Sequence, residues 1–323
     1  MADNTGSVSF RDRFDAIQTE VSKVIVGHDE ALRQVLTALM AKGHAILEGV
    51  PGLGKTLLIR SLAQALNVRF SRIQFTPDLM PADILGTNIV VDDETKGKRF
   101  EFQEGPIFGN AILADEINRA TPKTQSALLQ AMEERNVTVS RVTHALPPPF
   151  FVLATQNPIE MEGTYPLPEA QLDRFMFKIN VPASSLSELV EILDRTTGEK
   201  QPDVKVVADG QDIIRMQQEV RAAALPDDVR NYCAKLALAT HPGSEFATEE
   251  VNRFVRFGVS PRGAQALALT AKVMALGAGR SAASIEDVKA VALPSLRHRI
   301  ILNFEAEADG VSADDIIRKL ITD

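Results

Sequence analysis

Eight consecutive residues, Gly49-Val50-Pro51-Gly52-Leu53-Gly54-Lys55-Thr56, have the composition and spacing of a phosphate-binding loop. In such a loop the glycines let backbone N–H groups curl around phosphate oxygens. Lys55 can reach the β- and γ-phosphates, and Thr56 can offer its hydroxyl to Mg²⁺. The apolar segment 44–48 precedes the loop and a helical pattern follows it, whose N-terminus adds partial positive charge. The motif predicts a nucleoside triphosphate site, with Gly49, Pro51, Gly52, Leu53, Gly54, Lys55 and Thr56 as nucleotide-binding residues.

Two adjacent carboxylates, Asp115 and Glu116, end a second apolar run. In an open parallel sheet the carboxyl ends of the strands line the ligand crevice, so this pair is expected beside the phosphates. Asp115 suits Mg²⁺ binding, and Glu116 suits polarisation of an attacking water. Alone, such a run is weak evidence, because it more often marks only a strand that has a charged end. Together with the glycine-rich loop, it predicts nucleotide hydrolysis.

A third polar side chain, Asn157, follows the apolar run Phe150–Thr155. Asn157 could sense the γ-phosphate or orient the lytic water. It could also begin an Asn-Pro turn that contacts no ligand. The spacing leaves both interpretations open.

The elements that must position these side chains follow an alternation of short strands and longer helices, which is typical of a parallel sheet covered by helices. Helices are predicted over Lys55–Leu66 and Pro122–Glu134. Five short apolar runs bounded by turn residues predict buried strands: Ala45–Glu48, Arg69–Gln74, Ala111–Asp115, Phe150–Thr155 and Met176–Asn180.

Two further stretches, 87–104 and 136–144, alternate around turns and predict β-hairpins inserted into this core. In the first, Phe100 and Phe102 share one face, and basic residues crowd the turn. Its tip could contact a substrate, or it could be an exposed edge that lysines protect. The second places Ser140 and Arg141 where a two-residue turn favours Gly or Asn, so the position of its turn is less well defined.

After residue 185 the pattern changes to amphipathic helices, which predicts a separate helical domain. The predicted helices are Leu186–Arg195, Asp209–Ala224, Asp228–Thr240, Arg262–Gly277 and Ile285–Leu293. We expect an N-terminal extension over 1–20, an α/β nucleotide-binding core over 21–183 and the helical domain over 184–323.

Composition limits the functional classes. The 323 residues carry a net charge of −8, which disfavours a protein that coats nucleic acid by bulk charge. A single cysteine, Cys233, excludes an internal disulfide and Cys-rich zinc sites. The first residues lack a secretory pattern and no apolar run spans a membrane, so a cytoplasmic protein without membrane insertion is expected. The five histidines lack metal-ligand spacing and are expected to be polar surface residues.

Several longer strings resemble those of AAA+ ATPases, and in particular the MoxR family, which is related to magnesium chelatase ATPase subunits and MCM helicases. The strings are VIVGHDE (24–30), EGVPGLGKT (48–56), QFTPDLMPADILG (74–86), GPIFGNAILADEINRA (105–120), ATQNPIEMEGTYPLPEAQLDRF (154–175) and SPRG (260–263). The resemblance covers nearly the whole chain. It implies an α/β core whose five-stranded parallel sheet has the order 5-1-4-3-2 between helices, plus a C-terminal helical lid.

The resemblance also implies roles for individual residues. Asn157 matches sensor 1, Arg174 matches the arginine finger that reaches a neighbouring subunit's γ-phosphate, and Arg262 matches sensor 2 on the lid. Val26 and Gly27 match the segment that packs on adenine. Each arginine could instead be a solvated charge or a partner of nearby acids. The role of Arg119 is undecided in the same way: it could contact a neighbouring subunit, or it could pair with Glu133 or Glu134.

The implied activity is ATP hydrolysis with Mg²⁺ in a ring, expected to be a hexamer, that remodels or matures protein clients. A partner with a von Willebrand factor A (VWA) domain and a role in metal cofactor insertion are part of this expectation. The lid is expected to open and close over ATP about a hinge near 181–185. Two alternatives remain: an MCM-like nucleic-acid motor, which would need a basic channel, and a nucleotide-gated scaffold that hydrolyses ATP only weakly.

Overall fold

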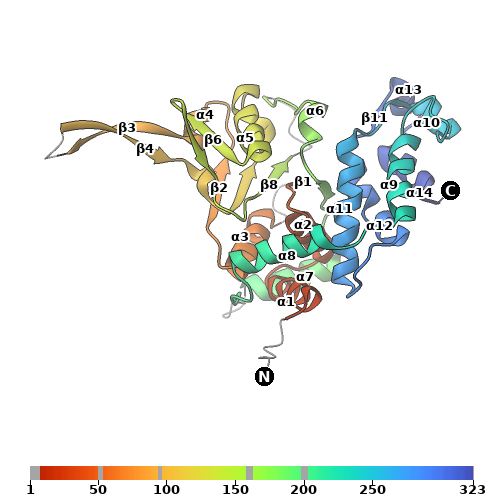
Figure 1. The fold of residues 1–323 in the computed structure, drawn as a ribbon, viewed down its shortest axis with the longest axis horizontal. Helices are drawn as coiled ribbons and strands as arrows, with labels where there is room; N and C mark the ends of the chain where they lie inside the picture. Colours follow the sequence, from red (N-terminus) through yellow and green to blue (C-terminus); the bar gives the residue numbers. More distant parts are fainter. Residues whose placement is uncertain (1–7, 50–53, 94–96, 158–162, 198–202, 323) are drawn as a thin grey trace.

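The computed structural model describes residues 8–49, 54–93, 97–157, 163–197 and 203–322. Figure 1 shows a sheet covered by helices in the N-terminal part and a mainly helical part that follows it. Within the described residues, no helix is both long and apolar enough to cross a membrane.

Five parallel strands form the central sheet in the order β2-β5-β8-β1-β9. Counted along the chain this is the order 5-1-4-3-2, so the expected topology is confirmed. Each predicted strand is correct to within one residue at either end, because a strand buried on both faces coincides with its apolar run. The strands are β1 (Ala45–Glu48), β2 (Phe70–Gln74), β5 (Ala111–Asp115), β8 (Phe151–Gln156) and β9 (Phe177–Asn180).

Alternate side chains of β1, β5 and β8 enter two different hydrophobic clusters, one on each face of the sheet. The first face is covered by α1 (Phe10–Ser22), α2 (Asp29–Met40), α3 (Lys55–Ala65) and α8 (Gly210–Ala222). The second is covered by α4 (Pro81–Leu85), η1 (Pro106–Phe108), η2 (Ile117–Arg119) and α5 (Pro122–Glu134). Helix α1 crosses the boundary expected at residue 20 and buries Phe10, Phe14 and Ile17 against the core.

Both hairpins form as predicted. The first consists of β3 (Gly86–Asp93) and β4 (Gly97–Glu104) and extends away from the sheet in Figure 1. Phe102 stacks on His144, with ring centroids 3.9 Å apart, whereas Phe100 is 77% exposed, so of these two rings it is Phe100 that a partner could contact. Between β6 (Asn136–Val139) and β7 (Val142–Ala145), Ser140 and Arg141 both have positive φ and form the predicted turn.

The C-terminal part contains the five predicted helices, further helices whose bounds were not predicted, and a pair of strands that the sequence did not indicate. It comprises α7 (Leu186–Thr197), α9 (Asp227–Ala239), α10 (Glu249–Phe254), α11 (Pro261–Gly277), α12 (Ile285–Leu296), α13 (Phe304–Ala308) and α14 (Ala313–Thr322). A short antiparallel pair, β10 (Val255–Phe257) and β11 (Ile301–Leu302), lies among them. With strands of three and two residues, this pair has no alternating pattern long enough to recognise.

The expectation that the histidines are surface residues is wrong for His28, His44 and His298, which are buried. His44 accepts a hydrogen bond from the Val152 N–H at 3.0 Å through Nδ1, and its Nε2 lies 3.2 Å from the Met132 carbonyl oxygen. It therefore connects β8 to α5. Burial, with a smaller effect of the Arg135 charge, lowers the pKa of His44 to about 3, so the ring is neutral at physiological pH.

Candidate functional site

The carboxyl ends of three neighbouring strands bring the predicted nucleotide residues to one edge of the sheet. β5, β8 and β1 are adjacent and parallel, and Asp115, Gln156 and Glu48 are their last residues. Glu116 and the buried Asn157 follow β5 and β8 directly. The phosphate-loop motif begins at Gly49, immediately after β1. The fold thus places the three groups of predicted residues along the same edge, as expected for a ligand crevice.

Part of the phosphate loop, including Pro51, Gly52 and Leu53, lies outside the described residues. Gly54 has a φ of +71° and caps α3, so a side chain at this position would strain the backbone even though a Cβ would meet open space. Lys55 begins the helix, and its ammonium donates a hydrogen bond to the Gly49 carbonyl.

Charges from the neighbouring strands act on Lys55. Burial lowers the pKa of its ammonium, while the carboxylates of Asp115, Glu116 and Glu48 act in the opposite direction. The lysine and the three carboxylates therefore lie within electrostatic reach of one another. A cation beside carboxylates suits the binding of a metal-bound polyphosphate, since the lysine can face the phosphates and a carboxylate can face the metal.

Two cavities lie near predicted site residues, one of about 310 Å³ and one of about 220 Å³. The smaller cavity adjoins the phosphate loop. Gly54 and Val26 both line this smaller cavity, together with apolar side chains that include Ile25, Leu57 and Ile192. The neighbouring Gly27 has a φ of +75°, and a Cβ there would lie 2.5 Å from the Glu188 side chain on α7. A mostly apolar cavity beside the phosphate loop suits a flat purine ring.

The two carboxylates of the site have different partners. Asp115 accepts hydrogen bonds from Thr155 Oγ1 at 2.7 Å and from Arg72 at 2.7 and 3.2 Å. Glu116 accepts hydrogen bonds from Gln74 at 2.9 Å and from Arg119 at 3.1 Å. Arg119 thus pairs with Glu116, rather than with the two acids considered from the sequence.

The backbone of Glu116 also departs from the strand. Its φ of +55° is left-handed, which is uncommon for a residue with a side chain and turns this residue out of the line of β5. The Glu116 N–H donates to Thr155 Oγ1 at 2.8 Å, so one threonine hydroxyl connects both carboxylate residues.

The oxygen atoms present fit magnesium. Mg²⁺ usually binds to one or two protein oxygens plus phosphate oxygens and waters. Thr56 and Asp115 supply a hydroxyl and a carboxylate of that kind. The described residues contain no cluster of three or more His, Cys, Asp or Glu side chains that could hold a metal on their own.

Arg174 and Arg262 lie together, but at the other end of the sheet. Both pair with Glu133 at the end of α5: Arg174 through a 3.0 Å contact, and Arg262 through a short hydrogen bond. They line the 310 Å³ cavity with Gly43 and His44, which precede β1, whereas the phosphate loop follows β1. Arg262 thus lies away from the phosphate loop of its own chain, and its assignment as sensor 2 stays a prediction.

The larger cavity is rich in cations. Besides Arg174 and Arg262, it is lined by Lys42, Arg135 and Arg221. The pKa of Lys42 is lowered, first by the charge of Arg135 and then by burial and the charge of Arg221. The buried Nε of Arg174 finds no acceptor among the described residues. This end of the chain thus has cationic groups that are well suited to an anionic partner.

Several residues of the two ends were not identified from the sequence: Arg72, Gln74, Thr155 and Arg299. Glu133 was considered only as a partner of Arg119, and not of Arg174 and Arg262. Thr155 and Gln74 could have been found from the strand order alone, since β8 and β2 flank β5 and Gln74 is in register with Asp115. Glu133 and Arg299 carry no such signal, because their partners come from distant parts of the chain.

Comparison with known proteins is consistent with this geometry. The family model described as "ATPase family associated with various cellular activities (AAA)" matches residues 44–177, and an AAA lid domain matches residues 247–320. Chaperone MoxR1 of Mycobacterium tuberculosis is 42% identical over 302 residues, covering 94% of this chain and 79% of that protein.

Two further relatives agree. Protein MoxR of Paracoccus denitrificans is 31% identical over 312 residues, covering 90% of this chain and 89% of that one. A solved structure from Cytophaga hutchinsonii, described as a candidate ATPase, is 41% identical with a TM-score of 0.90, and the match covers 97% of this chain and 94% of that one. From these matches and the shared fold, the chain belongs to the MoxR family of AAA+ ATPases.

Proposed function

We propose that this protein hydrolyses ATP to ADP and phosphate at sites shared between neighbouring subunits of a ring, and uses the energy to remodel protein clients. The observation that carries the proposal is the separation of the two half-sites. The phosphate loop and carboxylates lie at the carboxyl end of the sheet, and the paired arginines lie at the opposite end. Arg72 and Arg119 of the same chain already pair with Asp115 and Glu116, so a second chain is needed only to bring Arg174 or Arg262 to the phosphates.

The residues of the first half-site bind ATP and activate the attacking water. The loop and Lys55 hold the phosphates, Val26 and Gly27 adjoin the base, and Asn157 contacts the γ-phosphate or the lytic water. Mg²⁺ bound through Thr56 and Asp115 would neutralise charge on the β- and γ-phosphates. Glu116 accepts a proton from the attacking water, for which its carboxylate must be released from Gln74 and Arg119.

The residues of the second half-site complete the reaction centre from a neighbour. Arg174 offsets the charge that develops on the γ-phosphoryl oxygens, a contribution that in related NTPases amounts to ~10³–10⁵ in rate. Arg262 lies on the same surface and contacts the same Glu133, so we propose that it also serves the neighbouring subunit. The cations at this end complement the carboxylates and phosphates of the other.

Turnover measurements test the site. Lys55→Ala should weaken ATP binding. Glu116→Gln should leave binding intact and lower turnover by ~10²–10⁴, because the general base is removed. Glu134→Gln, an exposed carboxylate on α5, serves as the matched control and should hydrolyse ATP like the native protein. Equal turnover for native and Glu116→Gln protein would remove the proposed base and favour a scaffold.

Assemblies that mix two variants test whether the active site is shared between neighbouring subunits. Arg174→Ala subunits keep an intact phosphate site, and Glu116→Gln subunits keep an intact arginine. Mixing two inactive proteins should restore part of the turnover at the interfaces that combine the intact halves. Co-assembly without any rescue would contradict a shared site.

The remaining features of the proposal rest on the family. The relatives named as a chaperone and as MoxR proteins support client remodelling, and we extend this to a hexamer, a VWA-domain partner and a role in metal cofactor insertion. The cytoplasmic location stays a prediction. A pull-down with the Glu116→Gln protein in the presence of ATP should enrich one client with a VWA-domain protein. Hydrolysis stimulated by DNA, with a steep salt dependence, would instead identify a nucleic-acid motor.

A further inference from the structure

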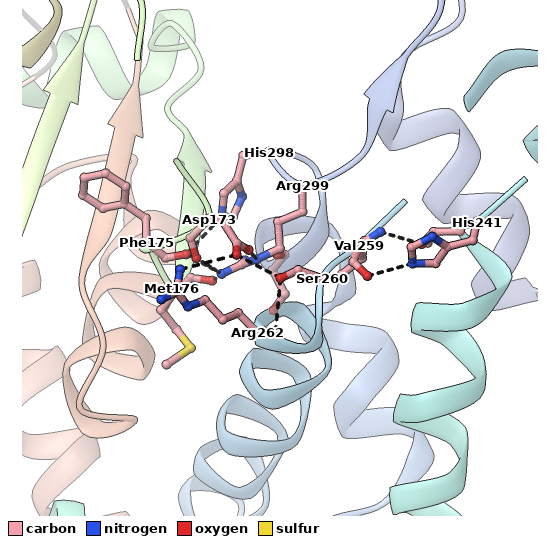
Figure 2. Close-up of polar contacts among 11 residues, drawn as sticks. Asp173, Phe175, Met176, His241, Val259, Ser260, Arg262, His298 and Arg299 are labelled. Atoms are coloured by element: carbon pink, nitrogen blue, oxygen red, sulfur yellow. Dashed lines mark hydrogen bonds and ion pairs between the residues drawn. The ribbon is translucent and has the colours of Figure 1, made fainter. Parts of the chain in front are cut away.

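Three consecutive residues after α12, Arg297, His298 and Arg299, contact the segment 173–178 that leads into β9 and contains Arg174. Figure 2 shows Asp173, Phe175 and Met176 on one side, with the lid residues Ser260, His298 and Arg299 directed toward them. The lid therefore contacts the core at the segment that bears Arg174.

Arg299 makes most of these contacts. Its side chain is 3% exposed. Nε donates to Asp173 Oδ1 at 2.8 Å, and Nη2 donates to the carbonyl oxygens of Asp173 at 3.0 Å and Phe175 at 2.7 Å. Nη1 donates to the Met176 carbonyl at 3.3 Å and to the Ser295 carbonyl. All five N–H groups of the guanidinium thus have acceptors, and four of the five acceptors belong to the core segment.

The neighbours of Arg299 strengthen the same contact. His298 Nε2 lies 3.0 Å from the Phe175 carbonyl oxygen. Arg297 donates to the Lys178 carbonyl at 3.3 Å while Asp314 holds its guanidinium from within the lid. Both lid side chains therefore contact a backbone carbonyl oxygen of the core.

A second lid element holds the other oxygen of Asp173. Ser260 Oγ donates to Asp173 Oδ2 at 2.9 Å and also caps α11, the helix that begins beside Arg262. A Cβ on Gly263 would lie 3.1 Å from Arg299 Cδ and 2.0 Å from Val259 Cγ1, so a larger residue would disturb the region through which Arg299 passes. Arg174 consequently sits between two residues, Asp173 and Phe175, that the lid binds.

We propose that Arg299 is a positioning residue that fixes Arg174 to the lid of its own chain. This inference rests on the proposed role of Arg174 in a neighbour's site. A buried guanidinium with five acceptors resists displacement, so the segment and the lid move as one body. Any reorientation of the lid then moves Arg174 relative to the neighbouring nucleotide, and hydrolysis in one subunit depends on the lid of the next.

Arg299→Lys tests this directly. Lysine keeps the positive charge of arginine. Its ammonium has three N–H donors, whereas the planar guanidinium has five in a fixed arrangement, so lysine cannot bind all five acceptors. We expect ATP affinity and KM to stay within about threefold of native values. Turnover should fall by tenfold or more, since misplacement of a reacting group by about 1 Å can cost about 10²-fold. Arg280→Lys is the matched control, because Arg280 pairs with Asp287 through two hydrogen bonds inside the lid, and its turnover should be unchanged.

Mixing separates positioning from a general loss of structure. Arg299→Lys subunits retain an intact phosphate site, so added Glu116→Gln subunits should restore turnover by supplying a correctly placed Arg174. Native turnover by Arg299→Lys, or failure of rescue with confirmed co-assembly, would overturn the inference. If Arg299→Lys does not fold, His298→Ala, which removes only one of the contacts, should show a smaller decrease with the same rescue, and unchanged turnover there would overturn it equally.

Arg174→Ala, measured in parallel, distinguishes the two proposals. Slow turnover by Arg174→Ala with normal turnover by Arg299→Lys would reject the positioning role and leave the proposed function standing. Normal turnover by Arg174→Ala would reject the arginine assignment itself.

Discussion

At the residue scale, the proposed reaction centre depends on side chains other than those predicted to contact the nucleotide. Thr155 donates to Asp115 and accepts from the Glu116 N–H, so one hydroxyl fixes both the proposed metal ligand and the proposed base. Glu133 holds Arg174 and Arg262 in the same chain. Because Arg174 and Arg262 are 29% and 45% exposed, solvent weakens these pairs, and we expect a neighbouring phosphate to displace Glu133 at little cost.

Replacing Thr155 tests the first of these arrangements. Thr155→Val keeps the shape but leaves the Glu116 N–H without its acceptor, and we expect turnover to fall by ~10–100-fold, as for other residues that orient metal ligands. Thr155→Ser should restore most of it. The control is Thr143→Val, since this threonine pairs with Thr138 on an exposed hairpin. A serine variant as slow as the valine variant would show that the hydroxyl alone does not maintain the arrangement, whereas native turnover by the valine variant would show that the hydroxyl is not needed.

At the element scale, the sheet was predictable and the docking of the lid was not. Short apolar runs, one phosphate loop and two hairpins are local signals, so the strands and the residues at their carboxyl ends followed from the sequence. The Asp173–Arg299 pair joins residues far apart in the chain, and the sequence contains no rule for how the lid packs on β9. The burial of His44 was missed for the same reason, because its acceptor and donor come from other elements.

The connection that His44 makes between β8 and α5 predicts a pH dependence of stability. The ring stays neutral in the native state down to about pH 3, whereas the unfolded chain takes up a proton below about 6.5. Between these values the unfolded state binds more protons. The free energy of unfolding should therefore rise with pH across this window, and His44 contributes a slope of up to ~1.4 kcal/mol per pH unit. The stabilising contribution of neutral His44 is fully present above the window and is lost as the pH falls through it.

Denaturant unfolding at pH 5 and pH 7.5 measures this effect. Glutamine cannot titrate in this range. In the His44→Gln protein, the difference in the free energy of unfolding between pH 5 and pH 7.5 should therefore be smaller by the contribution of the His44 proton. An identical difference in the native and His44→Gln proteins would show that His44 is not the group responsible.

At the scale of the whole molecule, the proposed ring needs a surface that neighbours can share. Leu186, Leu189, Val190 and Leu193 form an exposed apolar stripe along α7, and the same helix lines the cavity next to the phosphate loop through Ile192. We therefore expect this stripe to be covered by a second copy of the chain.

A double substitution tests the stripe. Leu189→Ser with Leu193→Ser removes apolar area at positions that are 49% and 52% exposed, so the fold should remain stable while assembly weakens. Sedimentation should show smaller species, and turnover per chain should fall at low protein concentration and recover at high concentration. Leu238→Ser, 49% exposed on α9, is the matched control. Unchanged assembly of the double variant would place the interface elsewhere.

The location of the phosphate loop and the paired arginines at opposite ends of one sheet gives the molecule a polarity. In the proposed ring each contact is head-to-tail, with the arginine end of one chain against the phosphate end of the next. Such contacts run in a single direction around a closed ring. Each chain then receives an arginine from one neighbour and supplies one to the other, and a copy that lacks Arg174 silences the site next door rather than its own.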